Sequence, residues 1–261
     1  MDLGIKGRRA LVLGSSQGLG AAIATALAQE GAIVTAAARN TDKIKDWAGN
    51  LTGGAAGNVQ AAHVDLADVA SVDALAESLL RSGGVDILVL NSGGPPPGEA
   101  RSAARSDWTA QFEAMAANLF HLAGRLLPAM EVRKWGRIIV LGSSGIEQPI
   151  PRLALSNAIR ASVLGWAKTL SAEVAANGVT VNVVLPGRIH TERVDQLDAA
   201  TASRQQQPVE DVAAASRATI PAGRYGAPQE FADVVAFLAS ERASYVTGAK
   251  IRVDGGAIRS V

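Results

Sequence analysis

The chain has 261 residues, of which 48% are hydrophobic and 19% charged, and its formal net charge is +1 at pH 7. This composition can fill the core of one large α/β domain, and the near-neutral charge argues against nucleic acid or an anionic membrane as the main partner. The absence of cysteine excludes disulfides, thiolate catalysis and cysteine metal sites. No apolar run approaches the ~20 residues that span a bilayer, and residues 1–9 hold no apolar signal core. We therefore expect a cytoplasmic protein with a small-molecule substrate.

Short apolar runs alternate with longer amphipathic stretches along the whole chain, and no repeat or linker divides it. The predicted strands are Arg9–Leu13, Ile33–Ala37, Val59–His63, Asp86–Leu90, Arg137–Leu141, Thr180–Val184 and Lys250–Val253. The predicted helices lie near 18–30, 41–49, 69–82, 107–133, 154–176 and 228–240. Strands separated by helices require right-handed crossovers and a parallel sheet covered on both faces. The sequence thus predicts one Rossmann-type, doubly wound domain over residues 1–261, with a seven-stranded sheet in three α/β/α layers.

The strongest local signal is the stretch from Leu11 to Gly20, in which a buried strand meets a glycine-rich turn and then a helix. This layout places a diphosphate on a helix N-terminus, and glycine is needed where a side chain would block the phosphate or the turn. The spacing is Gly-x-x-x-Gly-x-Gly. The residues that we expect to bind a dinucleotide here are Gly14, Ser15, Ser16, Gln17, Gly18, Leu19 and Gly20.

Two further strand ends carry candidate cofactor contacts. Arg39 lies nineteen residues after Gly20, where an acid would accept hydrogen bonds from a ribose and an arginine accommodates a 2′-phosphate. We therefore expect NADP(H), with NAD(H) less favoured, although Arg39 can also be an ordinary loop arginine. Asp65, followed by Leu66, either caps the next helix or accepts a hydrogen bond from the adenine amino group.

The fourth strand ends in Asn91, Ser92, Gly93 and Gly94, and three prolines follow. The glycines allow the backbone to lie against a flat ligand, and the prolines fix an extended wall or simply a stiff loop. Asn118 lies among apolar residues, where it either bridges backbone groups or holds a water near the site. The three histidines are widely spaced and predict no metal site.

The order and spacing of these motifs resemble the short-chain dehydrogenase/reductase family over nearly the whole chain. The supporting motifs, beyond those above, are Gly136-Arg-Ile-Ile-Val-Leu-Gly-Ser143, Val181-Asn-Val-Val-Leu-Pro186-Gly187, Tyr245-Val-Thr247-Gly248 and Val253-Asp-Gly-Gly256. The resemblance implies NAD(P)-dependent interconversion of alcohols and carbonyls, and a homotetramer or homodimer built on the fourth and fifth helices. It also implies cofactor contacts at Pro186, Gly187 and Ile189. We expect a homotetramer.

The resemblance implies a catalytic set of asparagine, serine, tyrosine and lysine, and this chain departs from it. Asn118 and Ser143 match, but Ser156 and Arg160 stand at the positions of the tyrosine and the lysine, and no Tyr-x-x-x-Lys occurs anywhere. A serine hydroxyl is a poorer acid than tyrosine, and arginine keeps its proton. Arg160 can still stabilise an oxyanion, contact ribose hydroxyls or hold a carboxylate. His190 is an alternative proton donor or a surface histidine.

A long polar segment follows Gly187, and the resemblance makes residues 188–222 the substrate lid; a solvated connector is the alternative. Three glutamines before Pro208 predict a hinge between two short helices. Its arginines (Arg188, Arg193, Arg204 and Arg217) are countered in number by nearby acids, so the sequence alone indicates no anionic substrate. Two functions remain open: an NADP(H)-dependent oxidoreductase with an atypical active site, or a catalytically weak NADP-binding regulatory or partner subunit.

Overall fold

The computed structural model describes residues 2–260 and contains one parallel sheet of seven strands. The strands are β1 (Arg9–Leu13), β2 (Ile33–Ala38), β3 (Val59–His63), β4 (Ile87–Leu90), β5 (Gly136–Leu141), β6 (Val179–Pro186) and β7 (Lys250–Val253). Their order is β3-β2-β1-β4-β5-β6-β7, so the direction in which successive strands are added to the sheet reverses between β1 and β4. Ligands bind at such a switch point, outside the carboxyl ends of the strands.

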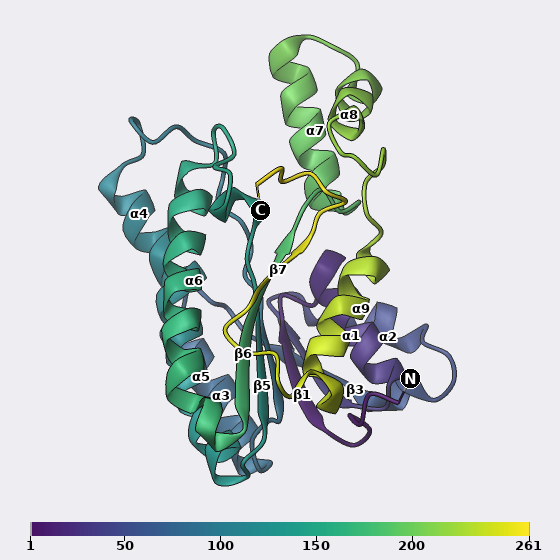
Figure 1. Ribbon diagram of the computed structural model, residues 1–261, viewed down its shortest axis with the longest axis vertical. Helices are drawn as coiled ribbons and strands as arrows, with labels where there is room; N and C mark the ends of the chain where they lie inside the picture. The colour runs from purple at the N-terminus through teal and green to yellow at the C-terminus, as the bar shows by residue number, and fades with distance from the viewer. Residues whose placement is uncertain (1, 261) are drawn as a thin grey trace.

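Helices cover both faces of the sheet, and each face has its own hydrophobic core (Figure 1). The helices are α1 (Gly18–Gln29), α2 (Thr41–Gly49), α3 (Val69–Arg81), α4 (Arg105–Phe112), α5 (Asn118–Val132), α6 (Ala154–Val174), α7 (Glu192–Gln205), α8 (Val209–Ala218) and α9 (Pro228–Ala239). Buried residues of α3, α5 and α6 form one core, and those of α1, α2 and α9 form the other. The predicted Rossmann-type three-layer fold is confirmed.

The helix predicted over 107–133 is interrupted, which the sequence pattern did not reveal. A π-helical turn, Glu113–Ala117, separates α4 from α5. The extra residue in this turn shifts the helical register immediately before Asn118, the first residue of α5. Such insertions are frequent at functional sites, because they redirect the side chain that follows.

The apolar residues of the two long helices belong mostly to the protein's own core. Leu119, Leu122 and Leu126 of α5 and Val163 of α6 are all buried, so these four side chains offer no surface to a second copy of the chain. The residues left partly exposed on these helices include Phe120 of α5 and Trp166 of α6, whose rings stack at 4.5 Å.

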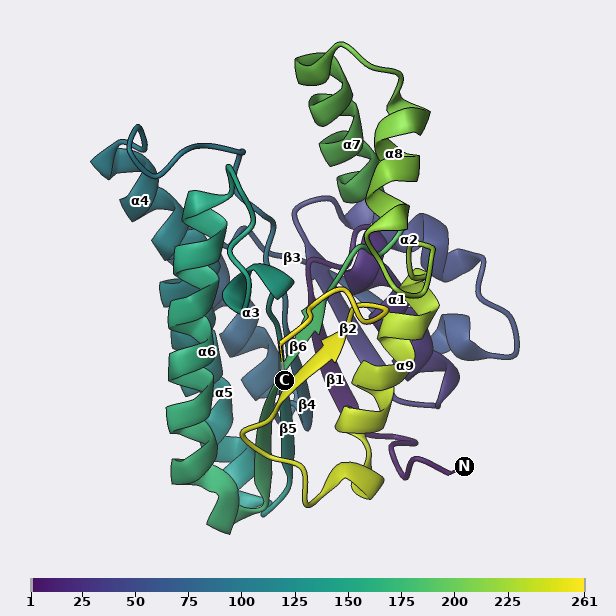
Figure 2. The same cartoon turned by 45° about the horizontal axis from the view of Figure 1, so that its top comes forward.

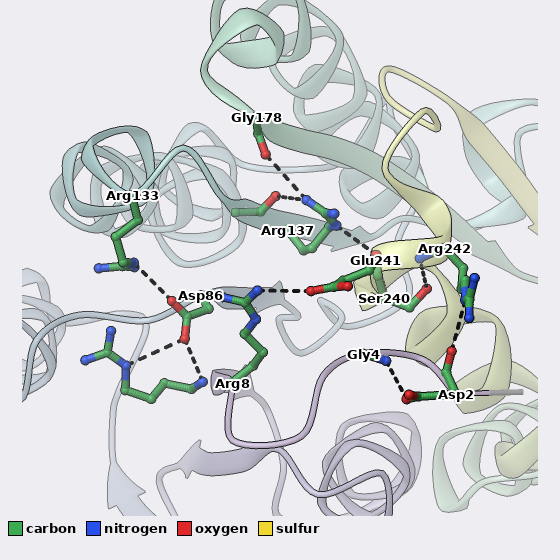
Figure 3. Close-up of polar contacts among 12 residues, drawn as sticks. Asp2, Gly4, Arg8, Asp86, Arg133, Arg137, Gly178, Ser240, Glu241 and Arg242 are labelled. Carbon is green, nitrogen blue, oxygen red and sulfur yellow. Dashed lines mark hydrogen bonds and ion pairs between the residues drawn. The ribbon is translucent and has the colours of Figure 1, made fainter.

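At the amino ends of the strands, hydrogen bonds and ion pairs between charged side chains link the strands to the neighbouring loops and helices (Figure 3). Asp86 is buried and accepts a 2.9 Å hydrogen bond from the backbone N–H of Arg9, and it pairs with Arg133 at 3.0 Å. Asp86 was predicted to begin the fourth strand, but β4 begins one residue later. This edge lies opposite the strand ends at which the candidate site residues gather.

Helices α7 and α8 project beyond the carboxyl edge of the sheet, next to each other in both views (Figures 1 and 2). The chain between them turns at Gln206, whose φ is +54°, close to the predicted hinge at the three glutamines. Within residues 2–260, no helix is both long and apolar enough to cross a bilayer.

Candidate functional site

The turn between β1 and α1 requires glycine at positions 14, 18 and 20. Gly14 and Gly18 have φ values of +64° and +60°, which favour glycine. A Cβ on Gly20 would collide with the carbonyl oxygen of Gly14. No side chain caps the N-terminus of α1, so its first backbone N–H groups and its dipole are available to an anion. The turn therefore fits a diphosphate.

The side chains of this turn differ in burial: Ser15 supports the turn from within, and Ser16 and Leu19 are partly exposed. Ser15 is fully buried, and its hydroxyl donates a 2.5 Å hydrogen bond to the carbonyl of Val12. Trp47 of α2 donates to the carbonyl of Ser15 at 2.9 Å. The Ser15 side chain therefore shapes the turn from beneath, and its backbone N–H also bonds within the protein, to the carbonyl of Ala37 at 3.3 Å. Ser16 and Leu19 are half-buried, and Leu19 packs against the hydrophobic core formed by α1, α2 and α9.

Arg39 lies exposed directly after β2 and forms no ion pair within residues 2–260. Asn40 caps α2 by accepting a hydrogen bond from the backbone of Lys43. The Lys43 ammonium reaches back to the glycine turn and donates to Gln17 Oε1 at 2.6 Å. Two cations thus lie where β2 meets the turn, an arrangement suited to the phosphate groups of a dinucleotide.

The loop after β3 connects to the start of α5 through a side-chain amide. Asn118 is buried and donates from Nδ2 to the carbonyl oxygen of Leu66 at 2.9 Å, so it bridges backbone groups as one of the two interpretations expected. Asp65 does not cap the next helix. Its carboxylate accepts from the backbone of Ala67, whereas Asp68 caps α3. The carboxylate of Asp65 therefore shapes the loop on which Leu66 lies.

The end of β4 contacts the glycine turn directly. Asn91 donates from Nδ2 to the carbonyl of Leu13 at 3.2 Å, and a Cβ on Gly14 would lie 2.7 Å from that nitrogen. Ser92 is buried, and its hydroxyl has no hydrogen-bond partner within the described chain. Gly93 has open space where a Cβ would stand. This loop therefore offers an accessible backbone and one buried polar group beside the switch point.

Ser143 and Arg160 lie at the end of β5, and Ser156 precedes Arg160 by one turn of α6. Ser143 follows β5, and its hydroxyl accepts a 3.0 Å hydrogen bond from the backbone of Gly145. Ser156 and Arg160 lie one turn apart on α6, and Ser156 is buried. Arg160 donates from Nη1 to the carbonyl of Leu141 at 2.8 Å and from Nη2 to the carbonyl of Ser92 at 3.2 Å. Its guanidinium therefore joins the carboxyl end of β5 to the loop after β4.

The charge of Arg160 is not balanced by a nearby acid. No ion pair involves it within residues 2–260. Burial and, to a smaller extent, the positive charge of Arg193 lower the pKa of the Arg160 guanidinium to about 10. The group stays protonated at neutral pH, so it can stabilise negative charge but does not act as a proton relay.

The chain after β6 lies close against the C-terminal segment. Gly187 donates its N–H to the carbonyl of Val253 at 2.9 Å, and a Cβ on it would lie 2.6 Å from the Cα of Asp254. Pro186 ends β6, and Ile189 is buried and bridges to Gly226. These contacts fix the start of the 188–222 segment.

The first turn of α7 reaches both sides of the candidate site. Glu192 accepts a 2.7 Å hydrogen bond from Gln17 Nε2 at the glycine turn. Arg193 donates to the carbonyl of Pro95 at 3.0 Å in the loop after β4. Consecutive residues of α7 therefore touch the turn after β1 and the loop after β4.

Known proteins match this chain over nearly its full length. The family model described as enoyl-(acyl carrier protein) reductase matches residues 14–257. The 3-oxoacyl-[acyl-carrier-protein] reductase FabG of Escherichia coli (strain K12) is 35% identical over 258 residues, which cover 97% of this chain and 98% of the relative. The chain belongs to the short-chain dehydrogenase/reductase family. This confirms the resemblance inferred from the motifs.

Two solved structures of short-chain dehydrogenases/reductases share the fold along the chain. The L-sorbose reductase of Gluconobacter frateurii, complexed with NADPH and L-sorbose, has a TM-score of 0.94 and 33% identity, and the match covers all of both chains. An actinorhodin polyketide ketoreductase variant with NADPH has a TM-score of 0.90 and 31% identity, covering 97% of this chain and 98% of the other.

Neither tyrosine of this short-chain dehydrogenase/reductase replaces the one missing from α6. The hydroxyl of Tyr225 donates to Asp198 of α7 at 2.7 Å, and Asp198 also pairs with Arg188 at 2.9 Å. Tyr245 is fully exposed near β7. His190, the alternative proton donor, is largely exposed and pairs with Asp195 at 3.4 Å. Its contacts are those of a surface histidine.

The sequence analysis did not single out Lys43, and it placed Glu192 and Arg193 in the expected lid without assigning a contact to either. Each contacts a loop from another part of the sequence. The only available signal was the position of Glu192 and Arg193 shortly after Pro186 and Gly187, at the start of the segment expected to form the lid.

Proposed function

We propose that this chain is an NADP(H)-dependent oxidoreductase that interconverts a carbonyl and an alcohol at an atypical active site. The observation that carries the proposal is the position of Arg160, whose guanidinium joins Leu141 to Ser92 at the ends of β5 and β4. In the sheet, β4 lies between β5 and β1, the strand that leads into the glycine turn. The NADPH in the solved L-sorbose reductase supports the choice of cofactor, as does the exposed Arg39.

The dinucleotide is held by the glycine turn and the N-terminus of α1, with Arg39 directed to a 2′-phosphate. Asn91, Gly93, Asp65 and Leu66 border it on the adjoining loops, and Pro186, Gly187 and Ile189 border it after β6. Bound NADPH supplies a hydride to the carbonyl carbon. The rest of the chemistry belongs to side chains of this chain.

The hydroxyls of Ser143 and Ser156 hold the carbonyl oxygen, and Arg160 stabilises the negative charge that develops on it. Because Arg160 keeps its proton and serine is a weak acid, the proton that completes the alcohol comes from solvent. Asn118 positions the loop at Leu66 through its amide. We assign the 188–222 segment, with α7 and α8, as the lid of a single domain, and we propose a cytoplasmic homotetramer.

The absence of a phenol beside Arg160 favours a second candidate, a catalytically weak NADP-binding regulatory or partner subunit. The buried Ser156 cannot be tuned by a neighbouring cation as a tyrosine can. The retained Asn118 and Ser143 positions, and the lid, favour the enzyme.

One experiment separates the two candidates. NADPH affinity is measured by fluorescence titration, and NADPH oxidation is then followed by absorbance with a panel of ketones, aldehydes and oxo acids. Micromolar binding with turnover of at least one member supports the enzyme. Binding with neither turnover of any member nor oxidation of any matching alcohol by NADP⁺ supports the regulatory subunit. Absence of binding to either NADPH or NADH contradicts both.

A further inference from the structure

Two arginines from different parts of the chain hold the same loop. Arg160 of α6 donates to the carbonyl of Ser92, and Arg193 of α7 donates to the carbonyl of Pro95. The Nη2 atom of Arg193 would also lie 3.4 Å from a Cβ placed on Gly94. The short loop Ser92–Pro95 therefore has a cation at each end, one from the fixed wall of the site and one from the lid.

Neither cation has an acidic partner within residues 2–260. The acids next to Arg193 are engaged elsewhere, because Glu192 accepts from Gln17 and Asp195 pairs with His190. Two other lid arginines differ in this respect: Arg188 pairs with Asp198 and Arg217 pairs with Glu210. The lid therefore holds similar numbers of arginines and acids, but none of these acids neutralises Arg160 or Arg193.

Arg193 is exposed, whereas Arg160 is largely removed from water, and a positive charge near a buried cation is unfavourable unless an anion joins the two. Burial and the nearness of Arg193 already lower the pKa of Arg160. Each terminal nitrogen of Arg160 spends one hydrogen on a carbonyl and retains the other. The buried hydroxyl of Ser92, which has no partner within the described chain, adds a further polar group to the same loop. The position is thus equipped to receive a small anion.

We propose that Arg160 and Arg193 together bind a carboxylate of the substrate, so that the compound reduced here is a short oxo acid and its product a hydroxy acid. This inference rests on the proposed oxidoreductase function. The balanced reaction is oxo acid plus NADPH plus a proton giving hydroxy acid plus NADP⁺. Charge-assisted, forked hydrogen bonds from arginine suit a carboxylate.

The substrate, rather than the cofactor, supplies this anion. The phosphates of the cofactor are directed to the glycine turn after β1 and to Arg39, whereas the two arginines lie along the loop after β4. Because Arg193 is on α7 and already donates to the carbonyl of Pro95, a bound carboxylate would hold the lid in the position seen here.

The test measures ligand binding separately from turnover. Calorimetry on the protein saturated with NADP⁺ compares pyruvate, acetoacetate and levulinate, whose carboxylates lie at increasing distance from the carbonyl, with their methyl esters. We expect the best oxo acid to bind at least about tenfold more tightly than its ester, as a charge-assisted hydrogen bond provides. Arg193→Gln should remove this difference, weakening acid binding far more than ester binding, whereas Arg193→Lys should retain part of it.

The matched control is Arg204→Gln, which removes an exposed arginine from the same helix and should change nothing. Equal binding of acids and esters by the parent protein would overturn the proposal, as would stronger binding of inorganic phosphate than of any oxo acid. A loss of NADP⁺ affinity in Arg193→Gln would also overturn it, because the arginine would then serve the cofactor. Rapid turnover of neutral ketones, with no effect of Arg193→Gln, would contradict carboxylate binding by the two arginines and the limitation by an atypical proton donor, but it would leave the NADP(H)-dependent oxidoreductase activity standing.

Discussion

Glu192 accepts a 2.7 Å hydrogen bond from Gln17, which ties the first turn of α7 to the glycine turn after β1. Gln17 in turn accepts from Lys43 at 2.6 Å. The carboxylate of Glu192 therefore lies near the turn before α1, where we propose that the cofactor's diphosphate binds. A negative charge there competes with a bound phosphate for the same positive field.

Replacement of Glu192 by glutamine should strengthen NADPH binding. We expect the dissociation constant to fall about twofold to fivefold at low ionic strength, because a charge near a helix terminus contributes a modest free energy. The effect should shrink in high salt, which screens exposed charges. Fluorescence titration measures it, with Glu210→Gln in α8 as the control. Weaker binding in Glu192→Gln would show that Glu192 assists the cofactor.

Arg39 should determine the preference for NADPH over NADH. It is exposed beyond β2 and forms no ion pair within the described chain, so its charge is available to a 2′-phosphate. Arg39→Asp should reverse the preference, since a carboxylate accepts from ribose hydroxyls and repels a phosphate. Titration of both cofactors tests this, with Arg204→Asp as a control of equal charge change. Equal affinities of the parent protein for NADPH and NADH would exclude the role of Arg39.

The start of α9 should contribute to stability in mild acid. Glu230 pairs with Arg224 and accepts from the backbone of Ala227, contacts that lower its pKa from 4.5 to about 2. Because the pKa of Glu230 is lower in the folded than in the unfolded state, its ionised form stabilises the fold at any pH above the unfolded-state pKa of 4.5. That stabilisation is lost as the pH falls through the folded-state pKa of about 2. Glu230→Gln should therefore lower Tm slightly near neutral pH, because the ion pair is exposed to solvent, and should flatten its decline in acid.

Thermal melts between pH 7 and pH 2 measure this effect. The control is Glu173→Gln, an exposed substitution on α6, which should leave the melting profile unchanged. A Glu230→Gln variant whose Tm follows the parent at every pH would show that the cap and the ion pair add nothing.

The outer face of α5 and α6 should form the contact of the proposed homotetramer. Gly165 of α6 is exposed, and nothing lies within 4 Å of a Cβ placed there. The substitution Gly165→Arg therefore adds a bulky charge to this face without disturbing the protomer, and arginine also favours a helix more than glycine does. We expect light scattering to report a tetramer for the parent and a smaller species for this variant. An unchanged mass in Gly165→Arg, or a monomeric parent, would contradict this assignment.

The fold followed from the sequence because most strands are short, mainly apolar runs bounded by polar residues or glycine, and β7 alternates charged and apolar residues. The bounds of β1, β3 and β7 were predicted to the residue. The π-helical turn before Asn118 escaped prediction because its apolar spacing differs too little from that of an α-helix.

The site was only partly predictable, since its motifs mark strand ends but not the contacts between them. The sequence indicated Ser156 and Arg160 on one face of α6, and the structure adds that Arg160 reaches Leu141 and Ser92. The approach of Arg193 to Pro95 joins segments that are ninety-eight positions apart. Local spacing carries no information about such a contact.

The central claim, an oxidoreductase limited by an atypical proton donor, is tested most directly by the turnover of a neutral ketone with NADPH in the Ser156→Tyr, Arg160→Lys double variant. We expect turnover to rise about 10²-fold over the parent, because a tyrosine tuned by lysine restores a positioned general acid. Neither single variant should show the increase, and NADPH titration verifies that each still binds cofactor. Rapid ketone reduction by the parent protein, or no gain in a double variant that binds NADPH, would contradict the account.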